Sequence, residues 1–247
     1  MRHHVQLLLV SVVFGAVVIA PSAGATIAPS ALYSSILVAG EEQHSVHYVS
    51  VQTSGPDRIV EVADAARTEG IQRITYTQGG QTGKVTVLVT PASAYVRGDA
   101  FALAKYMGYA EAASVVYSER WIQIPVTDPD YAPVSTDVTM PEAVEVYVPA
   151  PVWSSSSAPI QGQAVVGVSG SRPATAKSPA LSITLWARAT GTPLPLTQEI
   201  TKGLYSATVT FTRWNEPLRI SAPSDATPIG STGLESGAAK SNCGCAS

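Results

Sequence analysis

The stretch Leu181–Pro223 decides the fold, and it reads LSITLWARATGTPLPLTQEITKGLYSATVTFTRWNEPLRISAP. Apolar and polar residues alternate along three short runs within it, and the second and third runs begin at Leu194 and Tyr205. A period of two residues is typical of a strand with one buried face. Gly191 and Gly203 place turn residues between the runs. The stretch therefore predicts a three-stranded antiparallel meander whose apolar face needs a cover.

The N-terminal half carries the same alternation. Gly55-Pro56 and Gly79-Gly80 interrupt it with turn residues, so the connections between its runs are short. No long linker separates the two halves, which together predict one sheet rather than two domains. Outside the opening stretch the expected strands are Ser45–Thr53, Arg58–Ala66, Gly70–Gln78, Lys84–Thr90, Ser93–Val96, Arg120–Ile124 and Gly162–Val168.

Helical signals fill the middle of the chain. Asp99 is the expected N-cap of a first helix, and residues 110–117 continue at helical spacing. Thr139 opens a capping box, so a further helix is expected over 139–148, followed by a loop at Ser154–Ser157. These helices are the expected cover of the sheet. The fold class is therefore α+β and mainly antiparallel β.

The two ends of the chain differ from this domain. Residues 1–25 combine a weakly basic start, an apolar run over Leu7–Ala20 and the small residues Ala23-Gly24-Ala25, which predicts a cleaved secretory signal peptide. An uncleaved anchor is the alternative. Residues 230–247 are rich in Gly, Ser and Ala and predict a disordered tail. We expect a single domain over residues 26–229, secreted or in the extracytoplasmic envelope, without a lipoprotein cysteine.

Composition excludes two classes of function. Charged residues make up 13% of the chain, the net charge is −3 and no basic patch is visible, so no nucleic-acid partner is expected. The two cysteines, Cys243 and Cys245, have no histidine near them in the sequence and do not fill a tetrahedral zinc shell. We therefore expect no metal and no cofactor, and the role of the two thiols stays open.

Catalytic constellations are poor. Ser169 misses the spacing of the Gly-x-Ser-x-Gly nucleophile turn by one position. On a strand, His44 and His47 would point to opposite faces and predict a solvated strand edge rather than a pair of ligands. We expect no catalytic residue and no enzyme, and a hydrolase that uses Ser169 is the outlying alternative.

Apolar residues of the middle block and of the third run are the candidate ligand-binding residues. Sites for small ligands are mostly apolar, so these residues would suit either an ordinary core or a cavity between helices and sheet. The candidates are Phe101, Leu103, Met107, Val115, Val116, Trp121, Ile124, Val209 and Phe211.

Several segments share the pattern of a known family. They are the hairpin WARATGTPLPL at 186–196, the ending FTRWNEPLRISAP at 211–223, the strand GQAVVGVSG at 162–170, and YVRG at 95–98 followed by RWIQIP at 120–125. Together they resemble the actinobacterial LppX/LprG lipoproteins over roughly Val46–Pro223. Arg188 stands where that family has an acidic residue.

The resemblance implies both a fold and a function. The fold is a curved half-barrel sheet with helices on its concave face, similar to the LolA/LolB carriers. The function is binding of a lipid or glycolipid by its acyl chains between sheet and helices, with transient membrane contact and, as a further expectation, transport across the envelope. The alternative is a ligandless or lipid-sensing interaction module whose concave face is filled by its own helices. The ligand's identity and the oligomeric state stay open.

Overall fold

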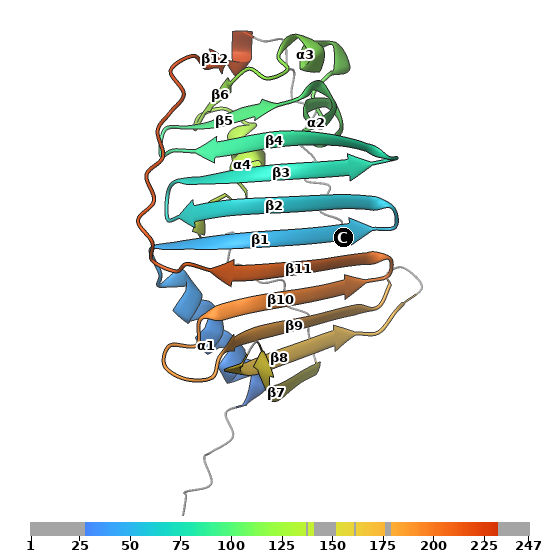
Figure 1. Cartoon of the computed structure of the whole chain (residues 1–247), viewed down its shortest axis with the longest axis vertical. Coiled ribbons are helices and arrows are strands. Elements are labelled where there is room, and N and C mark those ends of the chain that lie inside the picture. Colours follow the sequence, from blue (N-terminus) through green and yellow to red (C-terminus); the bar gives the residue numbers. More distant parts are fainter. Residues whose placement is uncertain (1–27, 137, 141–151, 161, 176–178, 232–247) are drawn as a thin grey trace, which may run out of the picture.

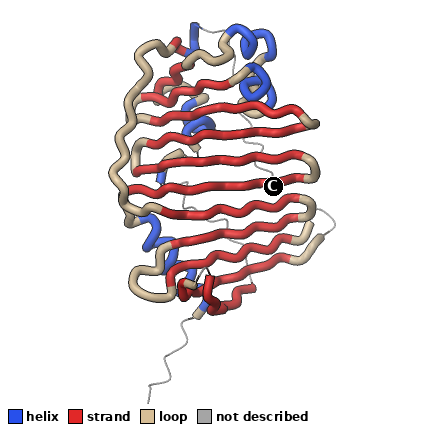
Figure 2. Tube along the Cα trace, in the orientation of Figure 1, coloured by secondary structure: helices blue, strands red, loops and turns tan. Residues whose placement is uncertain are grey.

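The computed structural model describes residues 28–136, 138–140, 152–160, 162–175 and 179–231. Within these ranges the chain forms one open, curved sheet with helices on its concave face (Figure 1, Figure 2). The strands are β1 (Ser45–Ser54), β2 (Asp57–Ala66), β3 (Gly70–Gln78), β4 (Gln81–Val89), β5 (Ser93–Gly98), β6 (Ile122–Pro125), β7 (Val152–Ile160), β8 (Gln163–Arg172), β9 (Leu181–Arg188), β10 (Pro195–Lys202), β11 (Tyr205–Thr212) and β12 (Thr227–Pro228). The helices are α1 (Pro29–Glu41), α2 (Ala100–Lys105), α3 (Glu111–Val116), α4 (Tyr131–Ser135) and the short 3-10 turn η1 (Ile229–Ser231).

The two predicted meanders are joined into one sheet by their central strands. The strand order is β12-β6-β5-β4-β3-β2-β1-β11-β10-β9-β8-β7, so the first strand of one meander pairs with the last strand of the other. In that antiparallel β1–β11 pair, Tyr48 lies opposite Phe211. Both residues face the helices, because the alternation of each strand continues across the join. The predicted α+β class, mainly antiparallel with helices on the concave face, is confirmed.

The hairpins close in tight turns at one end of the strands, on the right in Figure 1. Gly55 and Gly203 take the first central position of two-residue turns and have φ of +60°. Positive φ at that position is the requirement of the type II′ hairpin turn, which glycine meets without strain. Because β1 pairs with β11, the Gly55-Pro56 and Gly203-Leu204 tips lie next to each other.

Three apolar clusters hold the helices against the concave face. The largest packs Leu103 and Met107 of the α2 region and Val134 of α4 onto β3–β6. Ile36 of α1 packs onto Leu185 at the other end of the sheet. The remaining cluster lies between them around β1, β2 and β11, and it includes Tyr48, Ala63, Met140 and Phe211.

Asp99 caps α2 as predicted, since its Oδ1 accepts a hydrogen bond of 2.8 Å from the Ala102 amide. The predicted loop at Ser154–Ser157 is wrong, because these residues belong to β7, the edge strand that pairs with β8. Four serines in a row have no apolar alternation, and an edge strand can expose all of them to water. The helix predicted over 139–148 lies outside the described residues after Met140, as do residues 1–25 and 232–247.

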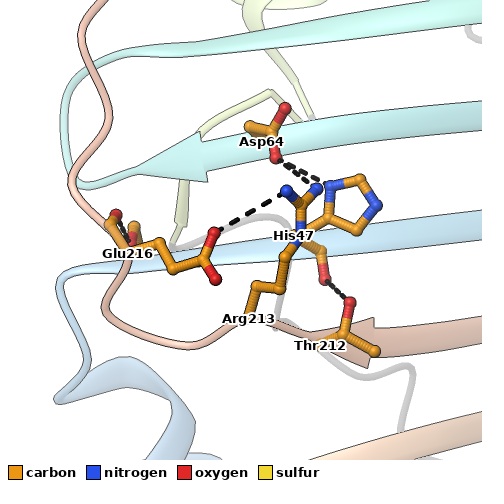
Figure 3. Close-up of polar contacts among 6 residues, drawn as sticks. His47, Asp64, Thr212, Arg213 and Glu216 are labelled. Atoms are coloured by element: carbon orange, nitrogen blue, oxygen red, sulfur yellow. Dashed lines mark hydrogen bonds and ion pairs between the residues drawn. The ribbon is translucent and has the colours of Figure 1, made fainter.

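A polar network closes the end of the sheet that lies opposite the hairpin tips (Figure 3). His47 Nδ1 lies 2.7 Å from Asp64 Oδ1, and Arg213 Nη2 lies 3.2 Å from the same oxygen. Arg213 Nη1 is 3.6 Å from Glu216 Oε2, and the buried Ser45 hydroxyl donates to the Glu216 carbonyl. We call these five residues the clamp. It fixes the start of the segment that runs from β11 along the sheet edge to β12 (Figure 1).

Candidate functional site

A cavity of about 550 Å³ lies where the strands end in hairpin turns, between two hairpin tips and the C-terminal end of α2. The β1–β2 tip, the β10–β11 tip and the α2 end each contribute to it, so its walls come from both meanders and from the helical cover. Its volume is in the range of small-ligand sites. It is lined by Gln52, Thr53, Ser54, Asp57, Arg58, Ile59, Tyr76, Gln78, Lys105, Tyr106, Pro179, Lys202, Gly203, Leu204 and Tyr205.

One wall of the cavity is aromatic. Tyr76 of β3 lies against Tyr106 at the end of α2, with ring centroids 5.4 Å apart, and against Phe101 with centroids 6.0 Å apart. Gly83 permits this approach, because a Cβ at that position would lie 2.8 Å from the Phe101 ring and 2.7 Å from Asp99 Oδ1. Burial, and secondarily the charge of Asp57, raise the pKa of Tyr76 above its usual value. The ring therefore stays uncharged at neutral pH.

A second wall is polar and is built on Glu61, a carboxylate only 7% exposed on the concave face of β2. Its Oε2 accepts a hydrogen bond of 3.1 Å from Gln52 Nε2, and its Oε1 accepts one of 3.2 Å from the Tyr106 hydroxyl. The Tyr205 hydroxyl donates to Gln52 Oε1 at 3.2 Å. Gln52, Tyr106 and Tyr205 line the cavity, and Glu61 lies behind them.

The rim carries charge and one prominent apolar side chain. Lys105 Nζ lies 2.6 Å from Glu111 Oε1, and this hydrogen bond lowers the pKa of Glu111. Arg58 and Lys202 add two further cations to the lining. Leu204, at the β10–β11 tip, is 84% exposed. The rim thus presents an apolar tip among basic residues.

All nine predicted ligand-binding residues lie in the described part of the chain, and none of them lines this cavity. Leu103, Met107 and Ile124 are buried in the large cluster under α2, and Phe211 is buried in the cluster around β1. Phe101 touches the cavity wall through Tyr76. The remaining four divide between half-buried Trp121 and Val209 and the exposed pair Val115 and Val116, at 68% and 56%. Their ligand-binding role stays a prediction.

The sequence does hold one sign of this cavity, which a search for apolar residues misses. Polar residues interrupt the apolar alternation at strand positions that face the core. Ser50 and Gln52 continue the concave face of β1 after Val46 and Tyr48, and Glu61 does the same on β2. Polar side chains at core-facing strand positions need buried partners or a polar ligand. That break in the apolar alternation points to this end of the sheet.

The other candidate groups are accounted for locally. Ser169 Oγ shares a hydrogen bond of 3.0 Å with Thr184 Oγ1, its neighbour across β8 and β9. His47 belongs to the clamp. Among the described residues, no group of three or more His, Cys, Asp or Glu side chains could hold a metal ion. No described helix is long and apolar enough to cross a membrane.

Known proteins were compared with the chain as a sequence and as a structure. No family model and no curated protein matches the sequence. Among solved structures, LprF from Mycobacterium bovis has 19% identity and a TM-score of 0.49, over 79% of this chain and 96% of that one. Lipoprotein LppX from Mycobacterium tuberculosis has 16% identity and a TM-score of 0.48, over 80% of this chain and 100% of that one. Both are of the group that the sequence resembles.

A more distant likeness is to an uncharacterized conserved protein from Thermus thermophilus. It has 9% identity and a TM-score of 0.39, over 81% of this chain and 97% of that one.

Proposed function

We propose that this protein binds a lipid or glycolipid by its acyl chains in the cavity at the hairpin tips, outside the cytoplasm. The cavity of about 550 Å³ between two hairpin tips and the C-terminal end of α2 is the observation that carries the proposal. Ile59, Tyr76, Tyr106, Pro179 and Leu204 supply its apolar surface. Each methylene group that leaves water for such a surface gains about 0.8 kcal/mol, so even part of one chain would be held firmly.

Transient contact with a membrane is part of the proposal. Leu204 projects from a rigid two-residue turn beside the cavity, and Lys202 precedes that turn. An apolar tip with adjacent basic residues favours the interface of a bilayer that carries anionic lipids. An acyl chain could then pass between bilayer and cavity without crossing open water. Transport between two membranes would follow from repeating that step at a donor and an acceptor.

The alternative, a ligandless or lipid-sensing interaction module, expects a concave face filled by the protein's own side chains. The centre of the face is filled in this way, with Met140 packed among Tyr48, Ala63 and Phe211. A cavity of more than about 300 Å³, the lower end of small-ligand sites, nevertheless favours a ligand at the hairpin tips.

Native mass spectrometry and organic extraction of the purified protein test the proposal. We expect a bound lipid mass, or uptake of a fluorescent fatty acid or phospholipid by delipidated protein. Protein that is free of lipid when purified and takes up none of these probes would contradict it.

A further inference from the structure

The short helix α3 exposes one of its faces, and that face is apolar. Val115 and Val116 are 68% and 56% exposed, and Ala112, three and four positions before them, is exposed as well. Residues spaced by three and four lie side by side on a helix, so these three residues form one stripe, which we call the α3 stripe. The opposite face is anchored through Ala113 and Tyr117, which pack against the cluster under α2. Apolar side chains grouped in this way, unlike single exposed ones, mark an interaction surface.

The α3 stripe adjoins the cavity. Glu111, the first residue of α3, lies 2.6 Å from Lys105 of the cavity lining. Val115 follows Glu111 by four positions, so it lies one helical turn along the same side of α3. Across the cavity, the lining includes Leu204, which is 84% exposed. The cavity therefore lies between two exposed apolar sites, one on α3 and one on the β10–β11 tip, and both are toward the hairpin-tip side of the sheet (Figure 1).

The two ends of the central strands also differ in charge. The cavity lining holds three cations, Arg58, Lys105 and Lys202, and the carboxylate of Asp57. Glu111 offsets Lys105, so this end keeps a small positive excess. An anionic surface therefore attracts the hairpin-tip end and repels the opposite end, where carboxylates are in excess. With histidines counted as neutral, the charged residues of the clamp, the C-terminal end of α1 and the β2–β3 turn are the carboxylates Glu41, Glu42, Asp64, Glu69 and Glu216 and the cations Arg67 and Arg213.

We propose that the α3 stripe and Leu204 together dock the protein on a bilayer that contains anionic lipids, with the hairpin-tip end toward the bilayer and the clamp toward water. The α3 stripe is the surface that this inference adds to the exposed tip. The inference rests on the proposed function, which requires the protein to meet a bilayer. Two apolar sites fix an orientation that one site cannot, because a single inserted side chain leaves the protein free to tilt about it.

A bilayer suits the two sites better than a protein partner does. Because the cavity lies between them, a protein that covered both sites would also cover the cavity, whereas a bilayer supplies the ligand there. Two valines and one leucine bury far less apolar surface than an acyl chain, and even one acyl chain gives only marginal, reversible membrane binding. Attraction between the positive end and anionic lipids is therefore needed for docking, and the contact stays reversible.

Vesicle co-sedimentation tests the docking surface. The double change Val115→Ser with Val116→Ser removes both side chains without adding charge, and serine and valine have similar helix propensities. Binding to vesicles of phosphatidylglycerol and phosphatidylcholine in equal parts should weaken about tenfold. The matched control, Val38→Ser with Val126→Ser, removes two valines that are 51% and 52% exposed elsewhere and should bind as the wild type does. Equal binding by the α3 variant and the wild type, or an equal loss in the control, would overturn the inference, as would equal binding of the wild type to vesicles without phosphatidylglycerol.

Uptake of a soluble ligand separates this inference from the proposed function. Val115 and Val116 lie outside the cavity lining, so the α3 variant should take up a fluorescent fatty acid from solution as the wild type does. If uptake is normal but the α3 variant binds vesicles as well as the wild type, docking through α3 is wrong and the proposed function stands. Loss of uptake in the α3 variant would assign the stripe to the cavity, and a dimer that dissociates in this variant would assign it to a second copy of the chain; either result overturns the inference. Absence of uptake by the wild type would overturn both.

Discussion

The three central strands β1, β2 and β11 differ in structure between their two ends. At one end, the clamp ties His47 and Asp64 to Arg213 and Glu216, with contacts of 2.7 to 3.6 Å. At the other end the same strands finish in tight turns around a cavity of about 550 Å³. The backbone pairing is continuous between the two ends, since β1 pairs along its length with both β2 and β11.

The difference shows that stability and binding are separated along the strands. The clamp satisfies its charges with each other and with the backbone, so it can fix the segment that follows β11. The cavity end directs its polar groups into a network on one wall and leaves apolar surface on another. A change at one end should therefore affect one property and spare the other.

The largest effect is expected from filling the cavity. Ile59→Trp adds an indole at a concave-facing position of the lining, so we expect ligand affinity to fall by about a hundredfold or more, equivalent to ~3 kcal/mol. The matched control is Val60→Trp, because the next residue of a strand points to the opposite face. Titration of a fluorescent fatty acid into both variants measures the effect. Equal binding by Ile59→Trp and the wild type would place the ligand elsewhere.

A change in the clamp should affect stability alone. Asp64 accepts from two cationic or polar groups, so Asp64→Asn should lower the free energy of unfolding by ~2 kcal/mol and leave ligand affinity unchanged. Glu216→Gln is the control, because the 3.6 Å contact of Glu216 with Arg213 is exposed and should contribute less than ~0.5 kcal/mol. Urea unfolding measures both. A ligand affinity that falls with Asp64→Asn would show that the two ends are coupled.

The sheet could be predicted from the sequence because its signals are local. Alternation of period two and the glycines at 55, 79 and 203 place the central strands to within a few residues, as in β2, expected at Arg58–Ala66 and observed at Asp57–Ala66. Asp99 marked the start of α2 for the same reason. By contrast, the serines of β7 show no alternation, because they are exposed on an edge strand whose one partner among the described strands is β8.

The cavity could not be predicted from apolar residues, because burial and cavity lining have the same composition. Leu103 and Phe211 are as apolar as a ligand site requires, yet both are buried in the core. What locates the cavity is a set of contacts between distant segments, such as Tyr205 with Gln52 and Tyr106 with Glu61. These depend on the β1–β11 join and on where α2 ends, which no local pattern specifies.

A smaller effect is expected at the exposed tip. Leu204→Asp removes the apolar side chain that would enter a bilayer, so binding to vesicles containing anionic lipid should weaken about tenfold. Val38→Asp is the control, since Val38 is an exposed valine of α1 outside the cavity lining. Vesicle co-sedimentation measures both variants. Soluble fatty-acid binding should stay unchanged in Val38→Asp, and in Leu204→Asp, which also changes the cavity lining, it should fall less than vesicle binding does. Equal loss in both variants would mean that added negative charge, and not the tip, weakens binding.

The smallest effect is expected at the rim ion pair, which is the exposed counterpart of the clamp. The hydrogen bond from Lys105 lowers the pKa of Glu111 below its ordinary value of 4.5. A lowered folded-state pKa stabilises the fold above the unfolded pKa, and that contribution disappears as pH falls through the folded value. Glu111→Gln should therefore unfold almost as the wild type does at about pH 7, and any small difference should vanish as the pH falls through the lowered pKa of Glu111. Carboxyl NMR titration checks the cause, because Lys105→Gln should return the Glu111 pKa toward 4.5; an unchanged pKa would show that Lys105 does not set it.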